Sequence, residues 1–328
     1  MQLRLQDQLN PVADEVSALI AVVRPILAGI LFGLKAEVTA EVGGHENVKL
    51  FMLPRLRRPG DGDCGICFEY AVHDAMNRND PMVLERVVDS LAKCKVPGKH
   101  SASILFGAEK TGSLQLIDTA KEWLTDESRL LAGTRGQPAK LKAHIDAAAA
   151  AFRKHGSGSE LPKSISGLWK ADLFLGNVDS DYWVATTVKI NKDHLEGARG
   201  LRIGVVPAKS GRGDHPYKDE ERNLVVCPLA HDGNFMELFY EGWDVMMQFL
   251  HHDARLPKES ALPRPAKRHV ARLLQERREY PVVEVLDALD PLAQPELLKT
   301  VERDADLVVR RTGDAPTTLL APLPNKVE

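Results

Sequence analysis

The stretch "YWVATTVKIN" (Tyr182–Asn191) decides the fold that the sequence predicts. Its β-branched and aromatic residues are typical of a buried strand, and the strand ends on a charge at Lys189. Ahead of it stands "KADLFLG", a second predicted strand whose one carboxylate is Asp172. The turn "NVDSD" joins the two strands, and its acidic residues, Asp179 and Asp181, are expected to be solvated at the tip of a hairpin.

The two strands are predicted to project an acid and a base toward one point. Side chains alternate across a strand, so Thr187 and Lys189 are expected on one face with Trp183. The opposite face, which begins at Val184, is expected to be the covered face of the sheet. If the strands pair through their turn, Asp172 and Lys189 approach each other. Aspartates and lysines also stand at strand ends in many α/β proteins without such a site, so the spacing alone leaves both interpretations open.

Such a point is sufficient for the hydrolysis of a phosphodiester bond. A hard divalent cation held by carboxylate oxygens neutralises the phosphate and lowers the pKa of a bound water. A neighbouring ammonium orients that water and stabilises charge on the phosphorus. One aspartate, one or two further oxygen ligands and a lysine would be enough.

The rest of the chain predicts an α/β protein with a mixed central sheet flanked by helices, a helical N-terminal element and a helical C-terminal appendage. Residues 1–58 are expected to hold an apolar helix and a β-hairpin around Gly43 and Gly44. Residues 59–256 form the predicted α/β core, which contains a helix that Asp80 caps. Residues 257–328 are basic and punctuated by prolines, with helical patterns at 264–278, 282–289 and 295–301.

A predicted helix, "CGICFEYAVHDAMN", precedes the strands and carries Glu69 within an apolar stretch. His73 follows four residues later, so both side chains lie on one helix face. A Glu–His pair of this kind is equally typical of a solvated surface. The order of parts favours a site: a helix with Glu69, a strand with Asp172, a strand with Lys189, then a helix and the strand "LRIGVVP".

In these stretches the chain resembles the PD-(D/E)xK, or restriction-endonuclease-like, nuclease superfamily. The core of that family runs α-β-β-β-α-β, with an acidic residue on the first helix and with Asp and (D/E)xK on the hairpin strands. The resemblance covers at most residues 64–207. It implies that Asp172 is a metal ligand, that Lys189 is the catalytic lysine and that Glu69 is an auxiliary ligand or positions the water.

The sequence departs from the family pattern at two positions. Ala171 replaces a proline that varies within the family, and Thr187 replaces the second acidic residue. A threonine hydroxyl is neutral, so a cation there loses one countercharge. Some restriction enzymes of the superfamily carry a small hydroxyl residue here, as Ser-x-Lys-x-Asn, and "TVKIN" resembles that variant. In this scheme Glu69 supplies the missing charge and the carbonyl of Val188 supplies a ligand oxygen.

The resemblance implies a function. It implies an endonuclease that hydrolyses phosphodiester bonds in DNA with Mg²⁺ or Mn²⁺ as cofactor, with RNA not excluded as substrate. It also implies a prokaryotic role in restriction or phage defence, as a homodimer or as a subunit of a defence complex.

Contacts with nucleic acid would have to come from local basic patches, because a formal net charge of −3 gives no global attractive field. Two loops, "PRLRRPGDGD" and "KSGRGDHPYK", and the helical pattern "RPAKRHVARLLQERR" are candidates. A charge-rich helix is also typical of a merely solvated face. The candidate residues are Arg55, Arg57, Arg58, Arg212, Lys267, Arg268 and Arg272.

Two other functions stay open. One is a catalytically degenerate nuclease fold that binds nucleic acid or a protein partner. The other is a cysteine peptidase, because "DGDC" before a helix resembles the nucleophile motif of OTU-type peptidases. Cys64 would then have a pKa lowered by the helix N-terminus, with His215 as its partner. Cys64 and Cys67, with Cys94 and His100, also allow a zinc site, although small cysteines that pack a helix are the simpler interpretation.

One stretch, "SALIAVVRPILAGILFGL" (Ser17–Leu34), approaches the length of a membrane span. Arg24 and Pro25 stand at its centre, where a charge in lipid costs ~2.5–3.5 kcal/mol. We therefore predict a buried or dimer-facing helix kinked at Pro25, with no membrane contact. Four cysteines in the chain do not make a disulfide framework and fit a reducing cytosol, so a cytoplasmic location is expected.

Overall fold

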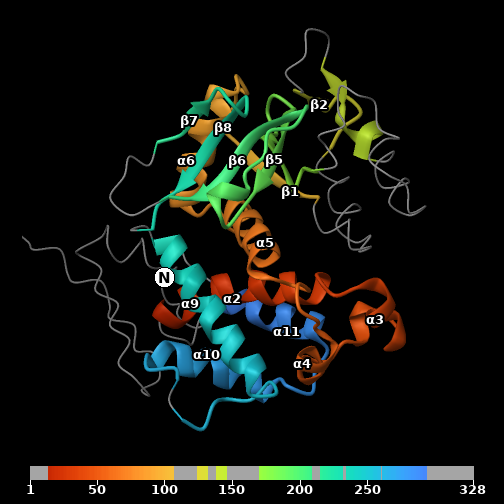
Figure 1. Ribbon diagram of the computed structural model, residues 1–328, viewed down its shortest axis with the longest axis vertical. Coiled ribbons are helices and arrows are strands. Elements are labelled where there is room, and N and C mark those ends of the chain that lie inside the picture. The colour runs from red at the N-terminus through yellow and green to blue at the C-terminus, as the bar shows by residue number, and fades with distance from the viewer. Residues whose placement is uncertain are drawn as a thin grey trace, which may run out of the picture. The chain divides into compact units, whose positions relative to one another are not determined.

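The computed structural model of the chain describes residues 14–106, 124–131, 138–145, 170–208, 215–231, 234–259 and 261–293 (Figure 1). The chain forms two compact units. The first comprises Met1–Leu27, Glu46–Pro54 and Leu238–Glu328, and the second comprises Ala28–His45 and Arg55–Glu237.

The second unit is built on a mixed eight-stranded sheet, which confirms the predicted α/β class (Figure 1). Antiparallel pairing joins the first three strands in the order β1-β4-β5, and parallel pairing continues through β6 and β8. Strand β7 closes this path antiparallel to β8, and β2 pairs with β5 and β3. The strands are β1 (Ser101–Leu105), β2 (Arg129–Leu130), β3 (Ala139–Lys140), β4 (Leu173–Asn177), β5 (Tyr182–Val188), β6 (Leu201–Pro207), β7 (Tyr217–Asp219) and β8 (Leu224–Leu229).

The predicted hairpin is the centre of this sheet. Strands β4 and β5 pair antiparallel, with Phe174 opposite Ala185 and Gly176 opposite Trp183. A Cβ atom at Gly176 would come within 2.5 Å of the ring of Trp183. Glycine at this position therefore lets the indole lie across the neighbouring strand.

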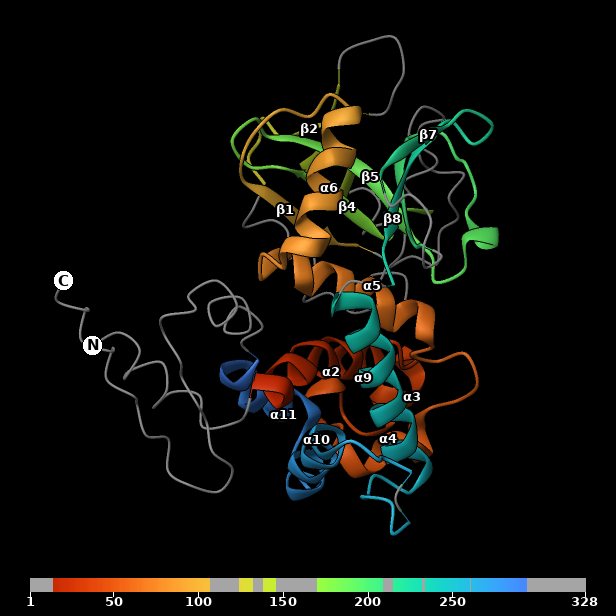
Figure 2. The same cartoon turned by 90° about the vertical axis from the view of Figure 1, so that its left-hand side faces the viewer.

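Both faces of the β4–β5 hairpin are covered, whereas the sequence predicted a covered face only on the side of Val184. Phe174 and Trp183 belong to a buried cluster that also includes Leu130 and Leu141, from outside the hairpin. The opposite face is covered by helices: α5 (Cys64–Asn77) contacts β1 and β5, and α6 (Pro81–Lys93) contacts β4 and β8. Figure 2 shows α6 lying along the sheet.

Helices α5 and α6 begin where the sequence predicts. The Asp63 carboxylate accepts the Ile66 amide at 2.9 Å and caps α5. The Asp80 carboxylate accepts the amides of the first turn of α6, and Pro81 occupies that turn. Each cap satisfies amides that have no partner within the helix, which fixes the starting residue.

The helices of the first unit include those expected from the C-terminal patterns. Two long helices, α2 (Asp14–Phe32) and α9 (Asn234–His251), and the short α4 (Leu53–Leu56) each extend into the second unit. The others are α10 (Pro265–Glu276) and α11 (Val282–Leu289), with the 3₁₀ helices η2 (Leu50–Met52) and η7 (Asp290–Leu292). A Cβ atom at Gly242 of α9 would lie 2.9 Å from Val22 of α2, so these helices pack closely. The pattern expected at 295–301 lies outside the described residues.

The predicted β-hairpin around Gly43 and Gly44 is wrong. Residues Ala36–Glu41 form helix α3 and His45–Asn47 form the 3₁₀ helix η1. Alanine and glutamate are good helix formers, and Gly43 and Gly44, with φ of 86° and 116°, end the helix through amides that donate to its last carbonyls. In the following segment Lys49 forms an isolated bridge with Pro281, and Leu50–Met52 form the 3₁₀ helix η2 in place of a strand.

Among the described residues, α2 is the one helix long and apolar enough to cross a membrane, and 72% of that stretch is buried within the structure. Pro25 lies inside the helix, and Arg24 forms an ion pair with Asp290 at 3.0 Å. A buried core helix of a soluble protein meets the same criteria, so length and composition here are weak grounds for a membrane span.

Candidate active site

Asp172 stands directly before β4 and is held there by both neighbouring strands. Its amide donates to the carbonyl of Thr186 at 2.9 Å, and its own carbonyl accepts the Phe106 amide at 2.9 Å. The residue is only 4% exposed. These bonds fix the backbone of Asp172 between β1 and β5, so the direction of its carboxylate is also restricted.

The end of β5 closes around one oxygen of this carboxylate. Asp172 Oδ2 accepts the Thr187 hydroxyl at 2.9 Å, the Val188 amide at 2.8 Å and the Lys189 ammonium at 2.8 Å. The Lys189 amide donates to Val205 of β6 at 2.9 Å, so successive amides of β5 point to opposite neighbours. Just before β4 begins, the Asp172 carboxylate thus replaces a backbone carbonyl as the hydrogen-bond acceptor of the Val188 amide.

Lys189 is held in its charged form. Burial by itself would lower the pKa of Lys189, but the adjacent Asp172 carboxylate outweighs burial and raises that pKa, with further contributions from Glu69 and Asp63. The Lys189 side chain is 33% exposed, against 5% for the side chain of Asp172. The Lys189 side chain is therefore the member of this pair that is accessible from solvent.

Glu69 shares the electrostatic surroundings of Lys189. It is half-buried on α5, which contacts β1 and β5, and its charge contributes to the raised pKa of Lys189. The structure thus brings Asp172, Thr187 and Lys189 together by direct bonds and adds Glu69 through its field. For Val188 the structure places the amide on Asp172, and the ligand role of its carbonyl stays a prediction.

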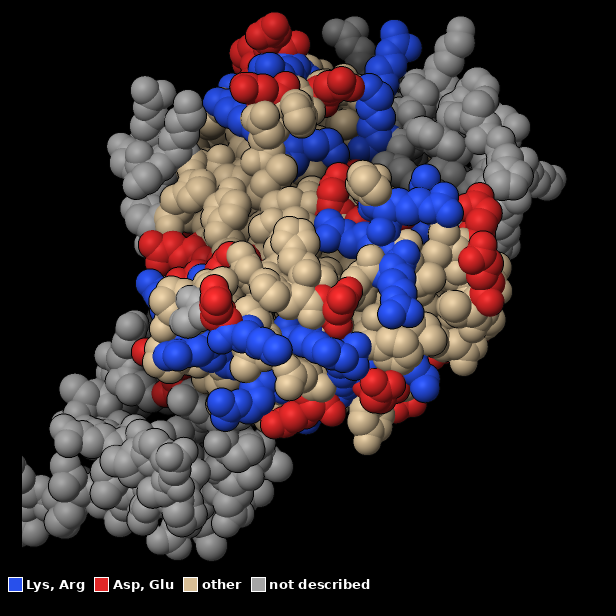
Figure 3. Space-filling view, turned by 60° about the horizontal axis from the view of Figure 1, so that its bottom comes forward, with Lys and Arg blue, Asp and Glu red and all other residues tan. Residues whose placement is uncertain are grey.

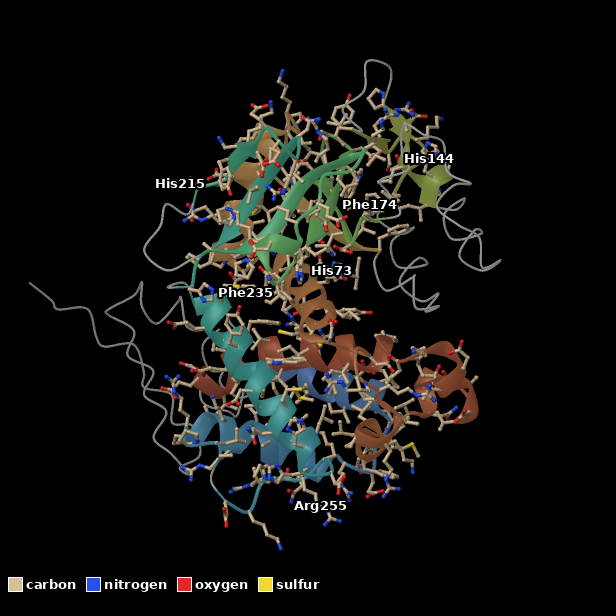
Figure 4. The ribbon with its side chains drawn as sticks, in the orientation of Figure 1. His73, His144, Phe174, His215, Phe235 and Arg255 are labelled. Atoms are coloured by element: carbon tan, nitrogen blue, oxygen red, sulfur yellow. The ribbon has the colours of Figure 1, made fainter. Side chains whose placement is uncertain are left out.

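His73 is bound into the fold, which excludes a solvated Glu–His pair. Its Nδ1 lies 3.1 Å from the Ser103 hydroxyl of β1, and its Nε2 lies 3.2 Å from the Asn77 amide nitrogen. Burial lowers the pKa of His73 to about 4. In Figure 4 its side chain lies where α5 reaches the strands. The sequence did not identify Ser103 or Asn77, although the four-residue spacing of Glu69, His73 and Asn77 is a signal for a shared face.

The described residues around Lys189 offer fewer metal ligands than an all-protein metal site needs. No group of three or more His, Cys, Asp and Glu side chains that could hold a metal occurs among the described residues. Mg²⁺ is commonly held by one or two carboxylates together with waters and substrate phosphates, and not by an all-protein cage. The two carboxylates that act on Lys189 are Asp172, by a direct bond, and Glu69, through its charge, and the Thr187 hydroxyl lies next to the first.

Asp179 is exposed at the tip of the hairpin, as expected, whereas Asp181 is half-buried. Asp179 accepts a hydrogen bond from Nδ1 of the His100 ring at 2.8 Å, and this bond is the main reason that the pKa of Asp179 is lowered. Asp181 accepts the Ser128 hydroxyl at 2.6 Å and the Trp183 indole at 3.0 Å. Burial would raise the pKa of Asp181, but these hydrogen bonds outweigh it and lower the pKa. Both residues fasten the hairpin to neighbouring segments.

The environment of Cys64 argues against a peptidase nucleophile. Burial, with a smaller contribution from Asp63, raises the pKa of Cys64 to about 11, whereas the peptidase hypothesis expects a lowered value. The proposed partner, His215, lies beside Arg86, with its Nδ1 3.3 Å from the guanidinium. The cap that starts α5 thus brings a carboxylate next to the thiol and disfavours the thiolate.

The proposed zinc ligands are not assembled. Cys67 Sγ donates to the Gly62 carbonyl at 3.5 Å, and Cys94 Sγ donates to the Arg202 carbonyl at 3.9 Å. The ring of His100 is the one that contacts Asp179. These cysteines are packing residues, as the simpler interpretation expected.

The basic loop before α5 has one structural and two exposed arginines. Arg57 donates to the carbonyls of Asp61 and Gly62 at 2.8 and 3.3 Å and so shapes the loop. Arg55 and Arg58 are exposed. Only these two can offer charge to a ligand while the loop keeps its shape.

Helix α10 likewise separates paired from exposed basic residues. Lys267 is largely buried in an ion pair with Asp244 at 2.9 Å, so its predicted role as a phosphate contact is not supported. Arg268 and Arg272 are exposed one turn apart. Figure 3 shows a broken row of Lys and Arg side chains with Asp and Glu between them. Arg212 lies outside the described residues.

A comparison of the chain with protein-family models, with curated proteins and with solved structures finds no match.

Proposed function

We propose that this protein is a metal-dependent nuclease of the PD-(D/E)xK type that hydrolyses phosphodiester bonds in DNA. The observation that carries the proposal is the closure of Thr187 and Lys189 onto Asp172 Oδ2, at 2.9 and 2.8 Å, at the start of β4. A buried carboxylate next to a charged and partly exposed lysine is the arrangement that the chemistry needs.

The order of elements supports the same proposal. Helix α5 with Glu69 is followed by α6 and β1, then by the short strands β2 and β3, by β4 with Asp172, by β5 with Lys189 and by β6, which runs parallel to β5. Once α6, β2 and β3 are set aside as additions, this order is similar to the family core up to the third strand. The connection from β5 to β6 carries only the 3₁₀ helix η6 (Lys192–His194), where the family core has an α-helix. That departure weakens the fold assignment but leaves the hairpin unchanged.

Each residue then has a role. Asp172 and Glu69 would hold Mg²⁺ or Mn²⁺, and the bound cation supplies charge neutralisation and a water of lowered pKa. Lys189 contacts the phosphate and stabilises the charge that develops on it. Thr187 donates its hydroxyl to Asp172 and thereby holds the carboxylate in place.

The substrate and the biological role follow from the resemblance. We propose DNA as the substrate and restriction or phage defence in the cytoplasm as the role, by a homodimer or a subunit of a defence complex. The formal net charge of −3 gives no overall attraction for DNA, so the phosphate contacts must come from local basic residues. We assign them to exposed arginines. They are Arg55, Arg58, Arg268 and Arg272.

A cleavage assay tests the proposal. Plasmid DNA, linear DNA and RNA are incubated with Mg²⁺ or Mn²⁺ and with wild type, Asp172→Ala or Lys189→Ala. We expect metal-dependent cleavage by wild type alone. Lys170→Ala is the matched control, because Lys170 is an exposed lysine in an ion pair with Glu196. Equal cleavage by all variants would refute the site.

A degenerate, binding-only nuclease fold is the second candidate. It is favoured by Thr187 at the position of the second acidic residue and by the ion pair that occupies Asp172 Oδ2. The same assay separates the two candidates. If wild type and both site variants cut nothing yet bind DNA with equal affinity, the protein is a binding module.

A further inference from the structure

Helix α5 carries a polar stripe whose middle member is His73. Glu69, His73 and Asn77 follow one another at intervals of four residues, so they lie on one face of the helix. Glu69 belongs to the proposed site, whereas His73 and Asn77 have no role in it. The stripe connects that site with the place where α5 meets the sheet.

The hydrogen bonds of His73 determine which ring nitrogen carries the hydrogen. Asn77 presents its amide nitrogen, a donor, to Nε2 at 3.2 Å, so Nε2 accepts. The neutral ring therefore carries its hydrogen on Nδ1 and donates it to the Ser103 hydroxyl at 3.1 Å. Burial lowers the pKa of His73 to about 4, which agrees with a neutral ring.

The acceptor of this bond belongs to the framework of the site. Ser103 is 5% exposed on β1, and its backbone lies opposite Leu175 of β4. Strand β1 also supports the residue before β4, because the Phe106 amide donates to the Asp172 carbonyl. One side-chain bond thus links the helix of Glu69 to the strand that holds Asp172.

We propose that His73 is a positioning residue, which locks α5 to β1 and so keeps the Glu69 carboxylate within the electrostatic surroundings of Lys189. For its consequence in metal binding, this inference rests on the proposed function. A purely structural His73 would affect stability alone. A positioning His73 affects metal binding as well, and does so through Glu69.

Manganese affinity provides a measurement that does not need cleavage. Binding of Mn²⁺ is followed by the electron paramagnetic resonance signal of the free ion, for wild type, His73→Ala, Glu69→Gln and the double variant. We expect His73→Ala to weaken Mn²⁺ binding about 10-fold, as loss of a residue that supports a metal ligand does. In the Glu69→Gln background His73→Ala should cause no further loss, because no carboxylate is left to position.

Three further variants separate positioning from folding. His73→Asn places an amide N–H near the position of Nδ1 and should restore Mn²⁺ affinity, while Ser103→Ala should reproduce the loss. Asp80→Ala removes the side-chain cap of α6 and lowers stability, but keeps the backbone bond from the Asp80 amide to Ala75 of α5, so it should leave Mn²⁺ affinity unchanged. Thermal unfolding of each variant confirms that the compared proteins are folded.

The outcomes distinguish this inference from the proposed function. A wild-type protein that binds Mn²⁺ while His73→Ala and Ser103→Ala bind it equally well overturns the positioning role alone. An equal loss from His73→Ala with and without Glu69 overturns it too. A wild-type protein that neither binds Mn²⁺ nor cuts DNA overturns the proposed function, and the inference with it.

Discussion

Two regions carry the charges that the sequence associates with nucleic acid, and they are built differently. At the start of β4, one carboxylate oxygen that is nearly inaccessible to water accepts three donors from the end of β5. On α10, Arg268 and Arg272 stand exposed on a helix whose buried side chains, such as Val270 and Leu274, do the packing. Charge at the first region is part of the fold, whereas charge at the second is added to its surface.

This difference determines what a substitution can reveal. Removing an acceptor at the first region leaves buried donors without a partner, which costs stability and, under the proposed function, activity as well. Removing an exposed arginine changes only the field that a ligand meets. Single substitutions should thus have a large effect at the first region. At the second region the effect on binding should be small and should decrease as the salt concentration rises.

The largest effect is expected from Asp172→Ala. Cleavage should disappear, and the free energy of unfolding should fall by ~2–3 kcal/mol, because the Thr187 hydroxyl, the Val188 amide and the Lys189 ammonium lose their shared acceptor. Urea denaturation and the cleavage assay measure the two losses. Asp172→Asn keeps an acceptor oxygen and should lose cleavage with less destabilisation. A stability unchanged in both would mean that the bonds at Oδ2 do not matter to the fold.

The next effect concerns Glu69 and Thr187. Thr187 stands where the family motif has its second acidic residue, and Glu69 is proposed to supply the charge of that residue. Glu69→Gln should lower the cleavage rate ~10³-fold, because the site loses its second negative charge. Thr187→Ala should lower it only ~10-fold, because it removes a bond that orients Asp172. Single-turnover rates at saturating Mg²⁺ compare them. If Thr187→Ala were the more damaging change, Glu69 would not complete the metal shell.

His73 should make stability depend on pH. The pKa of His73 falls from 6.5 to about 4 on folding. Between these two pH values the unfolded chain binds a proton at His73 and the folded chain does not. Stability from this source is present above pH 6.5 and declines as the pH falls toward 4, by ~3 kcal/mol in all at ~1.4 kcal/mol per pKa unit. Urea denaturation at several pH values measures it. His73→Asn, which does not titrate, should show a smaller decline, and equal declines would contradict a buried neutral ring.

The smallest effects are expected on α10. The double variant Arg268→Ala and Arg272→Ala should weaken DNA binding uniformly across sequences and reduce the salt slope of the binding constant by about one for each phosphate that is no longer neutralised. Stability should change by less than ~0.5 kcal/mol. Fluorescence anisotropy over a range of salt concentrations measures binding. Lys267→Met, which removes a lysine paired with Asp244, is the control and should leave the salt slope unchanged.

The hairpin was predictable because its information is local. Alternating apolar residues, a polar turn and the positions of Asp172 and Lys189 all lie within one short stretch. Where a pattern was short and ambiguous, the prediction failed: Ala36–Glu41 alternates as a strand does, but it consists of good helix formers and forms α3.

Contacts between distant segments could not be derived from the sequence. The residues around Phe174 in the sequence do not indicate that β1 pairs with β4. They also do not indicate that Leu141 packs in the same buried cluster as Phe174. The pKa of Cys64 shows the same limit, because a rule about helix ends predicted a lowered value, while burial and the neighbouring Asp63 raise it. Geometry within a hairpin can be derived from residue order, but burial depends on the whole fold.

The β4–β5 hairpin also has a consequence for folding kinetics. Asp172 and Lys189 are 17 residues apart in sequence, whereas His73 and Ser103 are 30 apart and belong to different elements. Closing the shorter loop costs less entropy, so the ion pair is expected in the folding nucleus, before α5 docks. Thr187→Ala should then slow refolding, and Ser103→Ala should chiefly accelerate unfolding, which stopped-flow fluorescence can separate. The acid and base of the site would thus meet before the fold that buries them is complete.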